Sequence, residues 1–142
     1  MADPFKEYKY TPRWGGNQIE HRPLVPVEVI ANGKTRNFRG LVDSGCETTT
    51  LNIAIATMLG VSLDDCEPTR IGGVGNAPQT AYRCELLLRM PDFDCEFTSP
   101  VLFANMAADV LLGFNNFFEH FRVNFERDKD IFTLTQIPKL KH

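Results

Sequence analysis

The chain has 142 residues, 43% of them hydrophobic, and a net charge of −3, which predicts one compact domain with a modest core. The acidic balance offers no electrostatic support for binding nucleic acid or an anionic membrane. No apolar run approaches the roughly 20 residues of a membrane-spanning helix, so we expect neither a nucleic-acid nor a membrane partner.

The four cysteines, Cys46, Cys66, Cys84 and Cys95, include no Cys-x-x-Cys pair. This spacing disfavours a zinc site, and we expect no metal and no cofactor. An even number of cysteines would also allow two disulfides. The first residues lack the apolar centre of a secretion signal, which instead favours free thiols and a cytoplasmic location.

Residues 1–23 mix aromatic residues with proline and glycine and show no clear period. We interpret them as an N-terminal arm or extended segment whose aromatic side chains pack, at least in part, on something else. From Leu24 the pattern becomes that of strands, because Val25, Val27 and Val29 alternate with other residues. The pair Asn32-Gly33 then predicts a tight hairpin turn.

The return strand of this hairpin, Phe38–Val42, ends at Asp43. Asn52 is typical of a helix cap and precedes a predicted short helix over Ile53–Leu59, which Gly60 would end. Two further strands are predicted, over Thr80–Leu88 and Cys95–Phe103.

The last third of the chain predicts a short buried strand, Val110–Leu112, and a short helix, Asn115–His120. Two strands follow, Phe121–Phe125 and Ile131–Thr135, around a polar turn. Seven or more short strands with two short helices predict an all-β class and a closed domain. We place this domain at residues 24–136 and a C-terminal tail at 137–142.

Three segments carry recognisable chemistry. In the first, Leu41–Thr49, an apolar run leads into Asp-Ser-Gly. In the second, Arg70–Asn76, three glycines occur within four positions, and in the third, Ala108–Phe118, an apolar strand is followed by a glycine and a short helix. Their order and spacing resemble those of the retropepsin-like aspartic proteases, over roughly Leu24 to Thr135.

This resemblance implies a closed acid-protease barrel with one lobe per chain, and an aspartic endopeptidase that acts on a peptide or protein substrate. By motif position, Asp43 is the catalytic aspartate, and Ser44 and Gly45 support it. Peptide hydrolysis of this kind needs two carboxylates that share a proton. The chain has one Asp-Ser-Gly, so the second carboxylate must come from a second copy, and a symmetric homodimer follows.

The resemblance also assigns a set of substrate-binding positions, several of them in a flexible glycine-rich flap. These positions are Leu41, Glu47, Ile71, Gly72, Gly73, Val74 and Leu111. Retroviral members have an arginine after the glycine of the third motif, where this chain has Phe114. That difference favours a resemblance to the cellular or bacterial single-domain branch.

Other interpretations stay open at this point. Asp43 could simply end a strand through an Asx-turn, the glycines could form an ordinary turn, and the whole could be a catalytically inactive dimerisation or binding module. We interpret Cys46 as a small packing residue rather than a nucleophile. Asp109 is either a solvated acid at a strand end or a residue that favours a basic substrate side chain.

One expectation concerns the dimer contact. Ile131–Thr135 carries apolar residues, and an edge strand of this kind is an aggregation hazard in water. We therefore expect it to pair with its symmetry mate, so that truncation after Asp130 removes the dimer.

Overall fold

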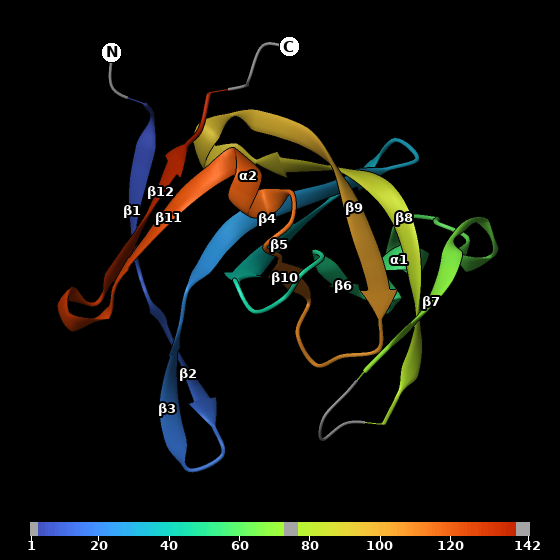
Figure 1. The fold of residues 1–142 in the computed structure, drawn as a ribbon, viewed down its shortest axis with the longest axis horizontal. Coiled ribbons are helices and arrows are strands. Elements are labelled where there is room, and N and C mark those ends of the chain that lie inside the picture. Colours follow the sequence, from blue (N-terminus) through green and yellow to red (C-terminus); the bar gives the residue numbers. More distant parts are fainter. Residues whose placement is uncertain (1–2, 73–76, 139–142) are drawn as a thin grey trace.

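The structure is a computed structural model that describes residues 3–72 and 77–138. Within them lie twelve strands, two short α-helices and three single 3₁₀ turns (Figure 1). The strands are β1 (Phe5–Lys9), β2 (Thr11–Gly15), β3 (Gln18–Arg22), β4 (Leu24–Ala31), β5 (Lys34–Val42), β6 (Thr50–Asn52), β7 (Glu67–Ile71), β8 (Gln79–Met90), β9 (Cys95–Ala104), β10 (Val110–Leu112), β11 (Phe121–Glu126) and β12 (Ile131–Gln136). The helices are α1 (Ala54–Met58) and α2 (Phe117–His120).

Seven strands form one sheet in the order β4-β5-β10-β6-β9-β8-β7. Strand β4 also pairs with β8, at Glu28–Arg89, Val29–Leu88 and Ile30–Leu87. This pairing closes the first six strands of the order into a ring, so that only β7 stays outside it. The expected class, a mostly β closed barrel with two short helices and one lobe in the chain, is confirmed.

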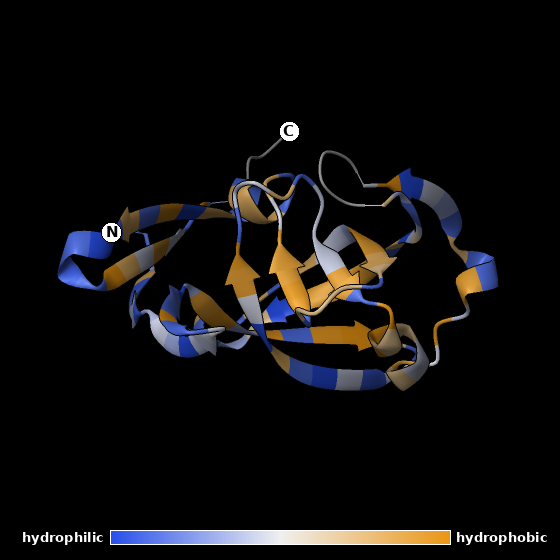
Figure 2. Cartoon of the chain, turned by 90° about the horizontal axis from the view of Figure 1, so that it is seen from below, coloured by the Kyte–Doolittle hydropathy of each residue, from blue (hydrophilic) through white to orange (hydrophobic). Residues whose placement is uncertain are grey.

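Alternation along the strands builds the core. Val25, Val27 and Val29 on β4 are all buried, whereas the residues between them are half-buried. Figure 2 shows the hydrophobic residues concentrated on the strands in the middle of the molecule. Since the side chains of a strand point alternately to opposite faces, one face of the barrel strands fills the interior and the other remains available for function.

The local predictions hold, with small shifts at the ends of elements. Asn32 and Gly33 both have positive φ angles, 53° and 72°, as a tight hairpin turn requires. Helix α1 begins one residue later than expected, and Asn52 Oδ1 accepts a hydrogen bond from the Ala54 backbone N–H at 3.0 Å. Helix α2 forms only from Phe117, two residues after the predicted start.

The second sheet has the order β1-β12-β11 and overturns the expectation for the terminal strand. Strand β12 is central, because β1 pairs with it from Phe5–Thr135 to Lys9–Ile131 and β11 pairs with its other edge. Its Phe132 and Leu134 are fully buried within the chain. The strand therefore has no free edge to offer a symmetry mate, and the predicted dimer contact through it is wrong.

The pairing partner of β12 comes from the N-terminal segment, which we expected to be an arm or extended segment and which forms the three strands β1, β2 and β3 between Phe5 and Arg22. Tyr8 stacks on Phe132 with a ring-centroid distance of 5.3 Å, and Tyr10 packs against the same ring at 5.2 Å. Two of the N-terminal aromatic residues therefore pack, on Phe132, whereas Phe5 and Trp14 are exposed. After β1, the β2–β3 hairpin extends away from the barrel (Figure 1).

Among the described residues, no helix is long and apolar enough to cross a membrane.

Phe132→Ala should lower the free energy of unfolding by about 3–5 kcal/mol, because it removes a large, fully buried ring and leaves a cavity between Tyr8 and Tyr10. Chemical denaturation of the wild type, of Phe132→Ala and of a control variant measures this free energy. Phe5→Ala is the control: Phe5 lies in the same sheet but is 64% exposed, so its loss should cost within about 0.5 kcal/mol. Equal effects would show that β12 is not the centre of this sheet.

Candidate active site

Strands β5 and β10 run parallel in the barrel and position the loop that carries Asp43. Their register pairs Gly40 with Val110, Leu41 with Leu111, and Val42 with Leu112. One residue further, the backbone N–H of Asp43 donates to the carbonyl oxygen of Leu112 at 3.0 Å. Asp43 is therefore fixed at the point where β5 leaves the sheet.

The Asp43 carboxylate is half-buried, and its Oδ1 accepts a hydrogen bond from the Gly45 backbone N–H at 2.9 Å. No described residue donates a hydrogen bond to Oδ2. Ser44 and Gly45 are exposed. A Cβ atom at Gly45 would lie only 3.3 Å from Oδ1, so a larger residue there would crowd the carboxylate. One oxygen is thus held by the turn while the other remains available.

The loop closes on Gly113, the first residue after β10. The Gly113 backbone N–H donates to Thr49 Oγ1 at 3.0 Å, and Thr49 is fully buried. A Cβ at Gly113 would lie 2.7 Å from both Thr48 C and Thr49 N. Real Cβ atoms do not approach backbone atoms this closely, so the contact requires glycine.

Two backbone hydrogen bonds continue the same junction. The N–H of Phe114 donates to the Cys46 oxygen at 2.6 Å, and that of Asn115 donates to the Glu47 oxygen at 2.8 Å. The first and third sequence motifs are therefore joined along their backbones. Thr49, the last residue of the first motif, supplies the buried side-chain link between them.

Cys46 lies in this junction as a packing residue. Its thiol contacts the Thr48 oxygen at 3.0 Å and lies 3.6 Å from Thr50 Oγ1. Burial raises the pKa of the Cys46 thiol above its ordinary value, although the Thr50 hydroxyl opposes this and nearby Asp43 adds to it. A nucleophilic cysteine needs the opposite shift, so the interpretation as a small packing side chain is the better one.

Apolar side chains lie beside the Asp43 loop on the outer face of the barrel. Leu41 and Leu111 are neighbours in the β5–β10 register, and Leu41 also pairs with Leu24 of β4. Ile71 ends β7 and packs against a separate cluster of Ala81, Leu102 and Ala104. The structure therefore brings two of the predicted subsite residues, Leu41 and Leu111, together next to Asp43.

The expected flap is only partly described. Strands β7 and β8 pair from Glu67–Arg83 to Ile71–Gln79 and form a hairpin. Gly72 follows with a φ of +119°, and a Cβ there would lie 2.9 Å from Pro78 Cα, so this position also requires glycine. Gly73 and Val74, which were predicted to cover bound substrate, lie outside the described residues.

Three residues near the loop are exposed: Glu47, Asp109 and Phe114. The carboxylate of Glu47 makes no ion pair with any described residue. Phe114 is 56% exposed and its ring lies 6.1 Å from that of Phe118. The position after Gly113, where retroviral members have an arginine, therefore carries an exposed apolar side chain that cannot form an ion pair.

Within the described part of the chain, no group of three or more histidine, cysteine, aspartate or glutamate side chains converges as metal ligands would.

Comparison with known proteins identifies the fold. No protein-family model matches this chain, and no curated protein matches it in sequence. Among solved structures, the chain is similar to a retropepsin-like aspartic protease from Rickettsia conorii, with a TM-score of 0.62 and 19% sequence identity. The match covers 95% of this chain and 94% of that chain. The fold is therefore that of a retropepsin-like aspartic protease.

Gly113→Ala should lower the free energy of unfolding by about 1–3 kcal/mol, because the new methyl group collides with backbone atoms of the Asp43 loop that cannot rotate away. Urea denaturation checks this value. Gly16→Ala provides the matched control: it has a positive φ but open space around its Cβ, so it tests backbone strain alone, at about 1 kcal/mol. A neutral Gly113→Ala would show that the two loops are not tightly joined.

Proposed function

We propose that this chain is an aspartic endopeptidase whose active site forms between two copies, each contributing Asp43. The observation that carries the proposal is the placement of Asp43. It is held at the end of β5 by the backbone N–H groups of its own turn, with one carboxylate oxygen available beside an apolar wall. The retropepsin-like fold, over 95% of the chain, supports it.

The chemistry follows from two carboxylates close together. Two carboxylates about 3 Å apart cannot both carry a negative charge, so a pair of Asp43 residues would share one proton. The ionised carboxylate takes a proton from the attacking water, and the protonated one donates to the carbonyl oxygen of the scissile bond. Ser44 and Gly45 keep the loop narrow enough for two copies to approach.

A homodimer is the simplest source of the second carboxylate. A two-fold axis places identical loops face to face, and the loop residues Ser44 and Gly45 are exposed and free to meet a partner. Since β12 is already paired on both edges, the contact must use other surfaces. Exposed Phe114, which is joined to the Asp43 loop through Cys46, is a large apolar side chain that could take part in such a contact.

Substrate would lie in extended form between the Asp43 loops and the flap. Leu41, Leu111 and Ile71 would contact bulky apolar side chains that flank the cut, Glu47 would bind substrate backbone, and Gly72, Gly73 and Val74 would close over the peptide. Cys46, Cys66 and Cys84 carry free thiols, which supports a cytoplasmic location, and Phe114 after the third-motif glycine favours the cellular or bacterial branch.

A catalytically inactive binding module is the alternative. The hydrogen bond from Gly45 to Asp43 is also what an ordinary Asx-turn makes. The available second oxygen of Asp43 and the positions that tolerate only glycine favour the enzyme, because a binding module would not need a narrow, acid-bearing loop.

Asp43→Asn should abolish cleavage of a quenched fluorescent peptide while the melting temperature and the dimer persist. The amide is nearly isosteric but cannot share the proton that the reaction needs. Pepstatin sensitivity of the wild type is the matching chemical test. Cleavage retained by a highly purified Asp43→Asn protein would contradict the aspartic mechanism.

Mixing experiments test whether two Asp43 residues are needed. If subunits exchange freely, the activity of wild type mixed with Asp43→Asn should fall as the square of the wild-type fraction, since a hybrid dimer has half a dyad. An unrelated protein added in the same amount is the control. A linear fall would mean that each chain works alone.

Activity should peak at acidic pH and decline towards neutrality, because the working pair carries one proton and loses it as the pH rises. A profile of kcat/KM against pH, with the fold checked at each point, measures this. A rate still climbing beyond about pH 8 would point to a different nucleophile or base.

A further inference from the structure

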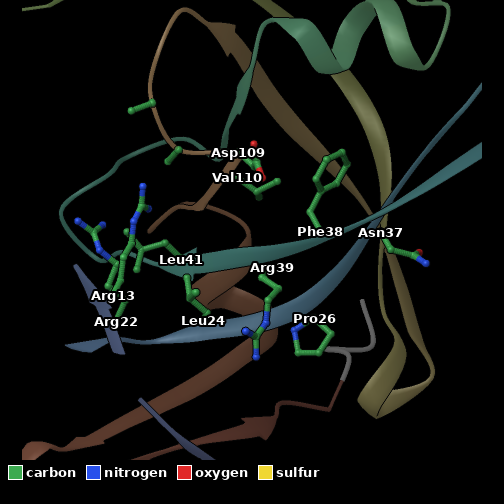
Figure 3. A pocket seen from close by; sticks show the side chains of 12 residues that line it. Arg13, Arg22, Leu24, Pro26, Asn37, Phe38, Arg39, Leu41, Asp109 and Val110 are labelled. Carbon is green, nitrogen blue, oxygen red and sulfur yellow. The ribbon is translucent and has the colours of Figure 1, made fainter. Parts of the chain in front are cut away.

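A pocket of about 610 Å³ lies beside the Asp43 loop, on the outer face of β4, β5 and β10 (Figure 3). Its apolar floor includes Leu24 and Leu41, and Asp109 stands at its rim. Arg13 and Arg22 of the β2–β3 hairpin form one side of it, and Arg39 of β5 lies next to the floor. Sequence reasoning missed this site, because its arginines are far apart in the chain and form no motif.

The side chains that line the pocket carry a net positive charge, with three arginines and one aspartate. Arg22 donates from Nη2 to Glu20 Oε2 at 2.5 Å and is largely neutralised by this pair. Neither Arg13 nor Arg39 makes an ion pair with any described residue, and Asp109 is the one acid of the lining. Two unpaired guanidinium groups therefore face the pocket in a chain whose net charge is −3.

The position of the pocket ties it to the candidate active site. Leu41 belongs both to the pocket and to the apolar wall beside Asp43, two residues further along β5. A peptide that is extended across Asp43 and continues over Leu41 would place its next side chains above the arginines. Each residue of an extended chain advances about 3.3 Å, so this side chain belongs to a position several residues from the cut.

We propose that this pocket binds an acidic side chain of the substrate, at a position outside the apolar pair that flanks the scissile bond. The proposal rests on the proposed peptidase function. Guanidinium groups bind carboxylates through paired, charge-assisted hydrogen bonds, and the apolar floor accommodates the methylene groups of glutamate. The β2–β3 hairpin is thereby a specificity element rather than an inert arm.

A set of peptides tests the proposal. Each has a bulky apolar pair at the cut and carries glutamate, glutamine or lysine at the third or fourth residue on either side of it. The enzyme variants are the double variant Arg13→Gln/Arg39→Gln and, as a control with one charge removed elsewhere, Arg122→Gln. Arg122 is exposed on β11 and does not line the pocket. Melting temperatures confirm that the variants fold.

Wild type and Arg122→Gln should prefer the glutamate peptide over the glutamine peptide by about five-fold in kcat/KM at one position, the size expected of partly exposed charge pairs. The double variant should lose this preference, and about 0.5 M sodium chloride should weaken it in wild type by screening. A preference that survives in the double variant would overturn the proposal. A preference for lysine would also overturn it, because Asp109 rather than the arginines would then bind the substrate side chain.

Binding to the Asp43→Asn protein, followed by fluorescence anisotropy, separates this proposal from the proposed function. Tighter binding of the glutamate peptide without any cleavage by wild type would support the pocket and reject the peptidase. Cleavage without a glutamate preference would support the peptidase and reject the pocket. If the double variant dissociated into monomers instead, the arginines would serve the dimer contact and the proposal would be overturned.

Discussion

The candidate site depends on one close approach, that of Gly113 to the loop after β5. At this point the backbone after β10 touches the backbone of Thr48 and Thr49 with no room for a side chain. The hydrogen bond from Gly113 to the buried Thr49 hydroxyl fixes the distance. Because β5 and β10 are also paired in parallel, the loop is tied at both ends, and this positions Asp43 next to Leu41 and Leu111.

Features of the fold that depend on a short stretch of sequence could be predicted, whereas those that depend on contacts between distant residues could not. The Asn32-Gly33 turn, the alternation on β4 and the strand–glycine–helix segment from Val110 are local patterns, and the structure reproduces them. The pairing of β1 with β12 joins Phe5 to Thr135 across nearly the whole chain. No local pattern reveals such a partner, so β12 was mistaken for a free edge, and the N-terminal residues could be described only as an arm or extended segment.

The same distinction between local patterns and distant contacts applies to the residues of the candidate site. Asp43, Leu41 and Leu111 could be proposed as site residues because the motif that carries each is short and continuous. The role of Thr49 as the buried acceptor for Gly113 depends on how two loops meet in space, and hydroxyl residues next to a turn have many other uses. The pocket arginines come from a hairpin and a barrel strand, and their convergence exists only in the folded chain.

The central place of β12 also changes where association energy can come from. Burial of Phe132 and Leu134 against the Tyr8 and Tyr10 region stabilises the single chain and is no longer available to a dimer. The homodimer proposed above would therefore be held by other surfaces, among them the exposed Ser44, Gly45 and Phe114 around the Asp43 loop. It would do so without the apolar area that a shared terminal strand would bury. Substrate that spans both loops would add area on both sides of the axis, so the active pair should be favoured most when peptide is bound.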